Sequence, residues 1–211
     1  MRRGDLILTP TGLWHEHGHD GDEPVVWLDV LDLPLVYFME ASYHVEGHRQ
    51  IVKPQHGERS YARGGVVPTP VFERSRKAYP MLRYPWSDAR AALESLAADQ
   101  PDLDAVQVTY TNPETGDHAE NILGFYALML RPGQTLKLPM RSPALVFHAI
   151  EGSAAVQVED QHFKLAAADT CCAPGYTAVT LGNASPDAPA FLFIADETPL
   201  HQKLGVFEIR N

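Results

Sequence analysis

The chain has 211 residues, of which 45% are hydrophobic and 21% are charged, and this is enough for one large or two small globular domains. Its formal net charge of −10 argues against a protein that binds the phosphate backbone of nucleic acids, because that task needs a basic surface. No apolar run is long enough for a transmembrane helix or a signal peptide. The adjacent Cys171 and Cys172 are poorly placed to form a disulfide with each other. We therefore expect a cytoplasmic protein without disulfides.

The first forty residues are predicted to form strands. Residues 5–9 are apolar and bounded by glycine and proline, which is typical of a short strand. Residues 14–19 alternate in character before a glycine-rich turn, and residues 25–30 are again mostly apolar. Because side chains at alternate positions of a strand share one face, three histidines are expected on the same side: His15, His17 and His19.

The middle of the chain is predicted to be a connector with one helix. Residues 44–80 are polar and rich in proline and glycine, and a short helix is predicted near 88–98 with Ser87 as its N-cap. Many short strands at close spacing then favour an antiparallel sandwich or barrel. These predicted strands are residues 106–110, 125–130, 146–150, 155–158, 163–165, 170–173, 178–181 and 191–195.

The sequence also contains an internal repeat. Residues 5–10 and 169–174 share an acidic residue, four strand residues and a proline, and residues 25–29 match 191–195. A full set of predicted strands precedes the second copy, whereas only four residues precede Asp5. The repeat therefore predicts two related barrels, of which the first lacks its front half in this chain.

Five stretches carry a resemblance to a known family: residues 4–36, 80–97, 112–116, 130–156 and 204–211. In order and spacing they resemble the gentisate 1,2-dioxygenase family of two-barrel cupin proteins (bicupins), with its salicylate and 1-hydroxy-2-naphthoate dioxygenase relatives. The first stretch resembles the second cupin motif of the family's N-terminal barrel, and the next resembles the segment between the barrels. The other three resemble the C-terminal barrel.

The resemblance implies an all-β fold of cupin jelly-roll barrels. Residues 1–40 would be the C-terminal half of a first barrel, and residues 41–104 would be a connector that includes the short helix. Residues 105–211 would form a second barrel without a metal. At the second barrel's counterparts of the ligand positions stand Pro139, Arg141, Val179 and Leu181, none of which is an imidazole.

The resemblance also implies an iron(II) cofactor. Family members hold the ion with three neutral imidazoles, which leaves room for a small aromatic carboxylic acid and O2. It assigns a metal ligand to His15, a second histidine near the substrate to His17, and a supporting carboxylate to Asp29. The family's other two ligands form a His-x-His pair upstream of the equivalent of Gly4. His19 is expected in a turn, and the loop residue His56 is expected to face solvent.

Two classes of function stay open from the sequence. The first is an extradiol-type ring-cleaving dioxygenase of aromatic-acid catabolism, with this chain incomplete and weakly active or inactive by itself. The second is a non-catalytic cupin remnant, or a subunit that binds small molecules or serves assembly. Open strand edges in residues 1–40 predict a homo-oligomer or completion by another chain, with no nucleic-acid or membrane partner.

Overall fold

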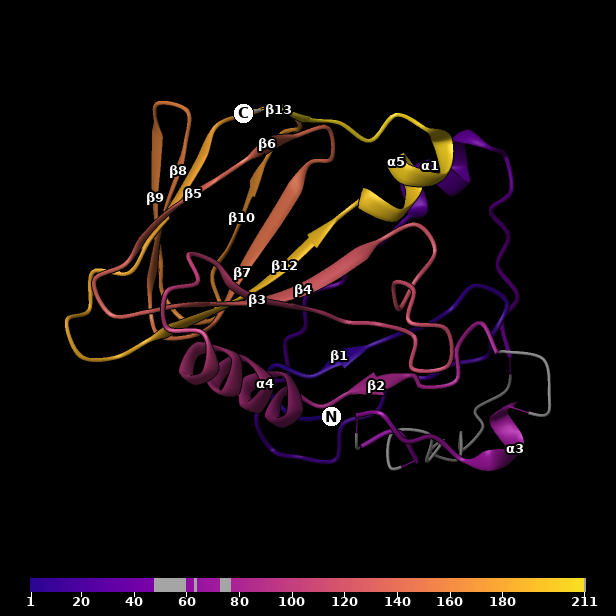
Figure 1. The fold of residues 1–211 in the computed structure, drawn as a ribbon. Coiled ribbons are helices and arrows are strands. Elements are labelled where there is room, and N and C mark those ends of the chain that lie inside the picture. Colours follow the sequence, from indigo (N-terminus) through magenta and orange to yellow (C-terminus); the bar gives the residue numbers. More distant parts are fainter. Residues whose placement is uncertain (48–59, 63, 73–76, 211) are drawn as a thin grey trace.

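The computed structural model describes residues 1–47, 60–62, 64–72 and 77–210, and two antiparallel sheets form the body of the molecule (Figure 1). The larger sheet has the strand order β10-β7-β12-β4-β3, and the smaller has the order β5-β11-β8-β9. The larger sheet contains β3 (Val106–Thr109), β4 (Gly124–Leu130), β7 (Leu145–Glu151), β10 (Thr170–Ala173) and β12 (Ala190–Asp196). The smaller contains β5 (Thr135–Leu138), β8 (Ala154–Val158), β9 (Gln161–Leu165) and β11 (Val179–Gly182).

Short strands and helices complete the fold. β1 (Leu6–Ile7) pairs with β2 (Arg83–Tyr84), and β6 (Met140–Arg141) pairs with β13 (Ile209–Arg210). The helices are α1 (Leu33–Phe38), α3 (Thr69–Phe72), α4 (Trp86–Asp99) and α5 (Thr198–Leu204). Within the described part of the chain, no helix is long and apolar enough to cross a bilayer.

The predicted all-β architecture is confirmed, but the closed barrel expected for the second half of the chain is not. Among the described residues, no hydrogen-bonded strand pairing joins the two sheets, so they face each other as an open sandwich. Each strand of these sheets ends at a turn after four to seven residues. None therefore runs far enough to pair in both sheets, which closure would need.

The main core lies between the two sheets. Alternate residues of each strand point inward, so that Leu145, Phe147 and Ala149 of β7 meet the inward residues of β8 and β11. Phe147, Leu192 and Leu181 have no appreciable exposed surface. This interior is packed with apolar side chains, which contribute most of the stability of such a sandwich.

A second apolar cluster covers the outer face of the larger sheet. Helix α4 lies along β3 and β4 (Figure 1), and it brings Trp86 and Leu93 against this face. The Trp86 ring meets Phe191 of β12 edge to face, with centroids 5.6 Å apart. Leu6 and Leu8 from the start of the chain join the same cluster. The first eight residues are thereby fastened to the body of the molecule.

The helix predicted near 88–98 is confirmed and is slightly longer than predicted. It begins after Pro85, whose fixed backbone angle suits a helix start, and it carries Asp88 in its first turn, where a negative charge is favourable. Its buried residues follow a helical spacing. The residue after Gln100 is a proline, which cannot continue the helix.

The Asp5 carboxylate holds β1 and β2 together. It accepts hydrogen bonds from Arg83 Nε at 2.8 Å and from the Trp86 backbone N–H at 2.9 Å. Burial alone would raise the pKa of Asp5, but these hydrogen bonds and the Arg83 charge hold it below the ordinary value of 3.8. The charged form of Asp5 is therefore stabilised by folding.

The strands predicted at residues 14–19 and 25–30 are absent, and that prediction is wrong for this structure. Both segments are irregular and exposed except for the partly buried Val30, and the helix α1 follows them. A strand needs a hydrogen-bonded partner, and within the described residues these two segments have none. The assignment of residues 1–40 to a first barrel stays a prediction. Residues 48–59, 63 and 73–76 of the predicted connector, including His56, lie outside the described residues.

Candidate functional site

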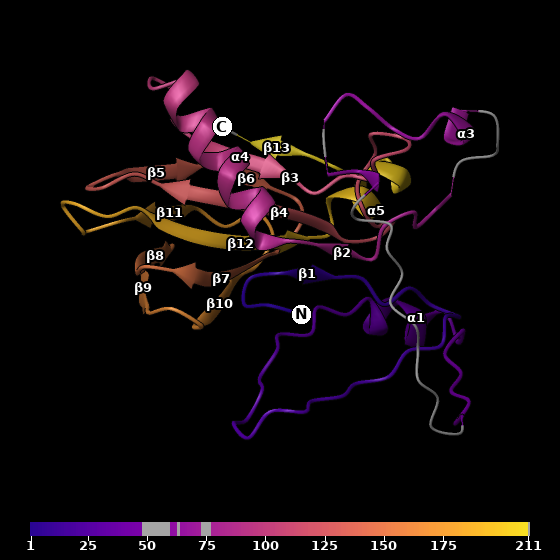
Figure 2. The ribbon, with the colours of Figure 1, turned by 90° about the horizontal axis from the view of Figure 1, so that it is seen from below.

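The candidate ligands lie on a segment that is separate from the two sheets. We call residues 10–47 the arm. In Figure 2 the arm, coloured indigo and purple, forms a wide loop beside the sheets rather than a layer upon them. Its side chains are exposed or only partly buried, whereas every strand of the two sheets contains at least one buried residue. The site therefore rests on local contacts within the arm.

His15, His17 and Trp27 form an exposed aromatic cluster. The rings of His15 and His17 are perpendicular with centroids 5.6 Å apart. The His17 ring stacks on Trp27, with centroids 5.1 Å apart and planes inclined by 7°. The two imidazoles are close neighbours although residues 14–19 form no strand. This pair is the chemically distinctive feature of the arm.

The other contacts of the predicted site residues are local or absent among the described residues. His15 Nδ1 lies 3.3 Å from the Leu13 carbonyl oxygen, and His19 Nε2 lies 2.6 Å from the Glu23 carbonyl oxygen, which ties His19 to its own turn. Asp29 is exposed. Among the contacts of the described residues, none joins Asp29 to either imidazole, so its supporting role stays a prediction.

The residues present do not build an iron(II) centre. An ion held only by imidazoles needs at least three convergent ligands to be fixed in position. Across residues 1–47, 60–62, 64–72 and 77–210, no group of three or more His, Cys, Asp or Glu side chains is placed to hold a metal. His15 and His17 therefore offer at most two imidazoles from one short stretch.

The interior of the sandwich presents an ion pair instead of imidazoles. Arg141 Nη1 lies 3.6 Å from Asp196 Oδ2, and the Asp196 side chain is completely buried. The carboxylate also accepts hydrogen bonds from the Tyr126 hydroxyl and from both the backbone N–H and the hydroxyl of Thr198. Burial, followed by the Asp196 charge, raises the pKa of Tyr126 to about 12. Val179 stands at another of the second barrel's counterparts of the metal-ligand positions, and it is buried in the apolar core.

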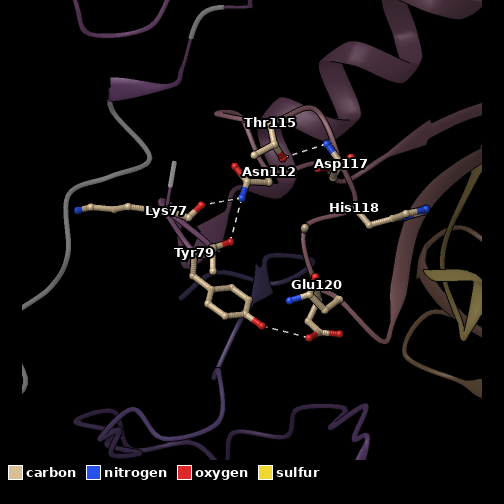
Figure 3. Close-up of a pocket in the computed structure, with 10 residues that line it drawn as sticks. Lys77, Tyr79, Asn112, Thr115, Asp117, His118 and Glu120 are labelled. Atoms are coloured by element: carbon tan, nitrogen blue, oxygen red, sulfur yellow. Dashed lines mark hydrogen bonds between the residues drawn. The ribbon is translucent and has the colours of Figure 1, made fainter. Parts of the chain in front are cut away.

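A cleft of about 250 Å³ lies outside the sandwich, between residues 77–79 and 112–121 (Figure 3). Tyr79 donates a hydrogen bond to Glu120 at 3.1 Å, and the Asn112 amide donates to the carbonyl oxygens of Lys77 and Ala78. Burial and then the Glu120 charge raise the pKa of Tyr79 to about 12. These hydrogen bonds fasten residues 77–79 to the turn at residues 112–116 and to Glu120. His118 Nδ1, also in the lining, is buried without a hydrogen-bond partner among the described residues. No sequence motif predicted this cleft.

Sequence comparison finds relatives that are similar to the chain along its whole length. No family model matches it. It is 72% identical over all 211 residues to a gentisate 1,2-dioxygenase from Ralstonia sp. It is 31% identical, over 98% of its length, to a 1-hydroxy-2-naphthoate 1,2-dioxygenase from Nocardioides sp.. The chain spans 59% of the first relative and 54% of the second, so it covers little more than half of the relatives that it matches.

Structural comparison agrees with the sequence. A crystal structure of a mutant salicylate 1,2-dioxygenase from Pseudoaminobacter salicylatoxidans in complex with gentisate superposes with a TM-score of 0.86. The match covers the whole of this chain and 60% of that one at 25% identity. The sheets described above are therefore those of a cupin fold. Identity along the whole chain and the shared fold confirm the resemblance seen in the sequence: the chain is similar over its full length to part of the gentisate 1,2-dioxygenases and their cupin relatives.

Proposed function

We propose that this chain serves an iron(II)-dependent dioxygenase that opens the ring of a hydroxylated benzoate, as gentisate dioxygenases do. The observation that carries the proposal is the 72% identity with the Ralstonia gentisate 1,2-dioxygenase along all 211 residues. Gentisate bound to a structural neighbour supports a small aromatic carboxylic acid as the substrate. The reaction breaks the bond between the carboxyl-bearing carbon and the adjacent hydroxyl-bearing carbon, and both atoms of O2 enter the product.

Within this proposal, the arm supplies this chain's share of the site. His15 is the metal ligand, His17 lies near the substrate, and Asp29 supports an imidazole. The close approach of His15 and His17 supports a common role. Because two imidazoles cannot fix a metal in one geometry, we expect the chain alone to bind iron(II) weakly and to turn over gentisate slowly or not at all. A small misplacement of reacting groups can cost about 100-fold in rate.

A chimera tests this function directly. In it, the matched 59% of the Ralstonia relative is replaced by these 211 residues, and the iron-loaded protein is given gentisate and air. We expect a rate of ring opening, followed by ultraviolet absorbance, within about tenfold of the parent enzyme, since most substitutions outside a site change little. His15→Ala in the chimera should abolish turnover, whereas His162→Ala on the exposed strand β9 should not.

A second candidate function is a non-catalytic cupin subunit. The exposure of the arm and the lack of a three-ligand group among the described residues favour it. A chimera that is folded and loaded with iron but inactive would select this candidate. Rapid turnover by the 211-residue chain alone, lost in His15→Ala, would instead contradict the weak activity proposed for the isolated chain.

A further inference from the structure

The indole of Trp27 lies flat against the imidazole of His17. The ring centroids are 5.1 Å apart and the ring planes differ by 7°. Trp27 is 48% exposed, whereas its neighbour Val26 is 92% exposed, so about half of the indole is covered although the segment lies at the surface. Two parallel rings at this separation form an attractive offset stack. The stack therefore restricts the orientation of the His17 ring.

The turn between residues 18 and 24 brings Trp27 onto His17. His19 Nε2 lies 2.6 Å from the Glu23 carbonyl oxygen and closes this turn. Gly21 lets the His19 ring lie against the backbone, since a Cβ atom at this position would lie 2.7 Å from the His19 ring carbon Cε1. The contacts that align Trp27 with His17 are therefore made within the turn itself.

The stack leaves the polar edge of the His17 ring open. Both nitrogens of an imidazole lie in the ring plane, at the edge, so a ring stacked on one face does not block them. In the described part of the chain neither nitrogen of His17 makes a hydrogen bond, whereas His15 and His19 each place one nitrogen near a carbonyl oxygen. The His17 ring is thus held in orientation while its nitrogens can still bind the hydroxyl or carboxylate of an aromatic acid.

We propose that Trp27 is a positioning residue for His17. By stacking on the imidazole, it fixes the angle at which the open ring nitrogens meet a hydroxylated benzoate. The inference rests on the proposed function, which places His17 near the substrate. The match with the gentisate-bound salicylate 1,2-dioxygenase mutant covers the whole of this chain, including the arm, and this supports a similar path of the arm in a complete site.

Proton NMR of the 211-residue chain tests the stack without measuring turnover. The face of an indole shifts nearby protons upfield, and the loss of signals in His17→Ala identifies those of the His17 ring. We expect Trp27→Leu to move these signals downfield. Trp14→Leu is the matched control, since Trp14 belongs to the same arm but its ring lies beside Gly47, and it should leave the His17 signals unchanged.

Kinetics of the iron-loaded chimera described above test the positioning role. Trp27→Leu should lower kcat/KM for gentisate about tenfold or more, because a small misplacement of a reacting group is costly. Trp27→Phe keeps an aromatic face and should retain most of the rate. Phe163→Leu, an exposed aromatic residue of β9, is the control and should leave kcat/KM unchanged.

A double-mutant cycle separates positioning from a general structural role. In a His17→Ala background, Trp27→Leu should have no further effect on kcat/KM, because the indole acts only through His17. A residue that merely stabilised the arm would lower kcat/KM equally in both backgrounds. Circular dichroism checks that each variant is folded, and Trp27→Met takes the place of Trp27→Leu if the latter is not.

Two results would overturn the positioning role and leave the proposed function intact. The first is a set of His17 signals that Trp27→Leu does not move. The second is an active chimera in which Trp27→Leu has no effect, or has the same effect with and without His17. A folded, iron-loaded chimera that does not open gentisate before any substitution would overturn the proposed function, and the positioning role with it, even where NMR shows the stack.

Discussion

The arm and the sandwich contain similar apolar residues, but these are exposed in the arm and buried in the sandwich. Phe38 of the arm is 88% exposed, whereas Phe147 of β7 is fully buried. Both lie in stretches rich in apolar residues, so composition does not explain the difference. β7 has hydrogen-bonded partners on both sides, β10 and β12, and it faces a second sheet. Burial therefore depends on whether a segment finds partners.

The largest expected effect comes from emptying the core of the sandwich. Phe147→Ala should lower the free energy of unfolding by about 3–5 kcal/mol, because it removes a fully buried ring and leaves a cavity. Urea unfolding of the 211-residue chain, followed by circular dichroism, measures it. Phe38→Ala is the matched control in the arm. A loss below about 1 kcal/mol for Phe147→Ala would show that the packing described here is wrong, since surface changes give losses of that size.

The buried ion pair should have the next largest effect. Asp196→Ala removes the acceptor for Tyr126 and Thr198 and leaves Arg141 without its partner, so we expect a loss of about 3 kcal/mol in the free energy of unfolding. Asp187→Ala removes an exposed carboxylate from the preceding loop and serves as the control. Equal stability of the two variants in urea would contradict the network around Asp196.

The stability that Asp5 contributes by attaching the start of the chain to the rest of the fold should depend on pH. The pKa of Asp5 is lowered by folding, so its contribution to stability is present above the ordinary value of 3.8 and is lost as the pH falls through the folded-state value. Asp5→Asn should cost about 1–2 kcal/mol at neutral pH and less in acid, because its partners lose a charged acceptor. Thermal unfolding between pH 7 and pH 3 measures this, with Asp99→Asn as the exposed control. A cost that is the same at both ends of the range would contradict the assignment.

The smallest expected effect is in the arm of the isolated chain. Phe38→Ala should change the free energy of unfolding by no more than about 0.5 kcal/mol, because its ring is exposed and contributes little packing. The same urea titration as for Phe147→Ala measures it. A loss above about 2 kcal/mol would mean that the arm is already covered in solution, since only buried rings cost that much. In that case the contrast between the two regions would disappear.

Local patterns in the sequence determined much of the fold. Short apolar runs at close spacing predicted the strands of the sandwich. Apolar spacing predicted α4 to within two residues at its start and one at its end. The alternation at residues 14–19 predicted that His15 and His17 share one side, and the structure places their ring centroids 5.6 Å apart although no strand forms. The resemblance to a family also came from the sequence, and whole-chain identity confirms it.

The tertiary structure decided what depends on distant partners. Asp5 pairs with Arg83, which lies 78 positions away in the sequence, and Asp196 pairs with Arg141 inside the sandwich. No local sequence pattern predicts either pairing. The alternation at residues 14–19 predicted a strand, yet this segment remains irregular and exposed. The sequence determines which residues could form a strand, because periodicity is a property of the segment itself. Only the tertiary structure decides which strands form, because a hydrogen-bonded ladder and a buried face both require a neighbour.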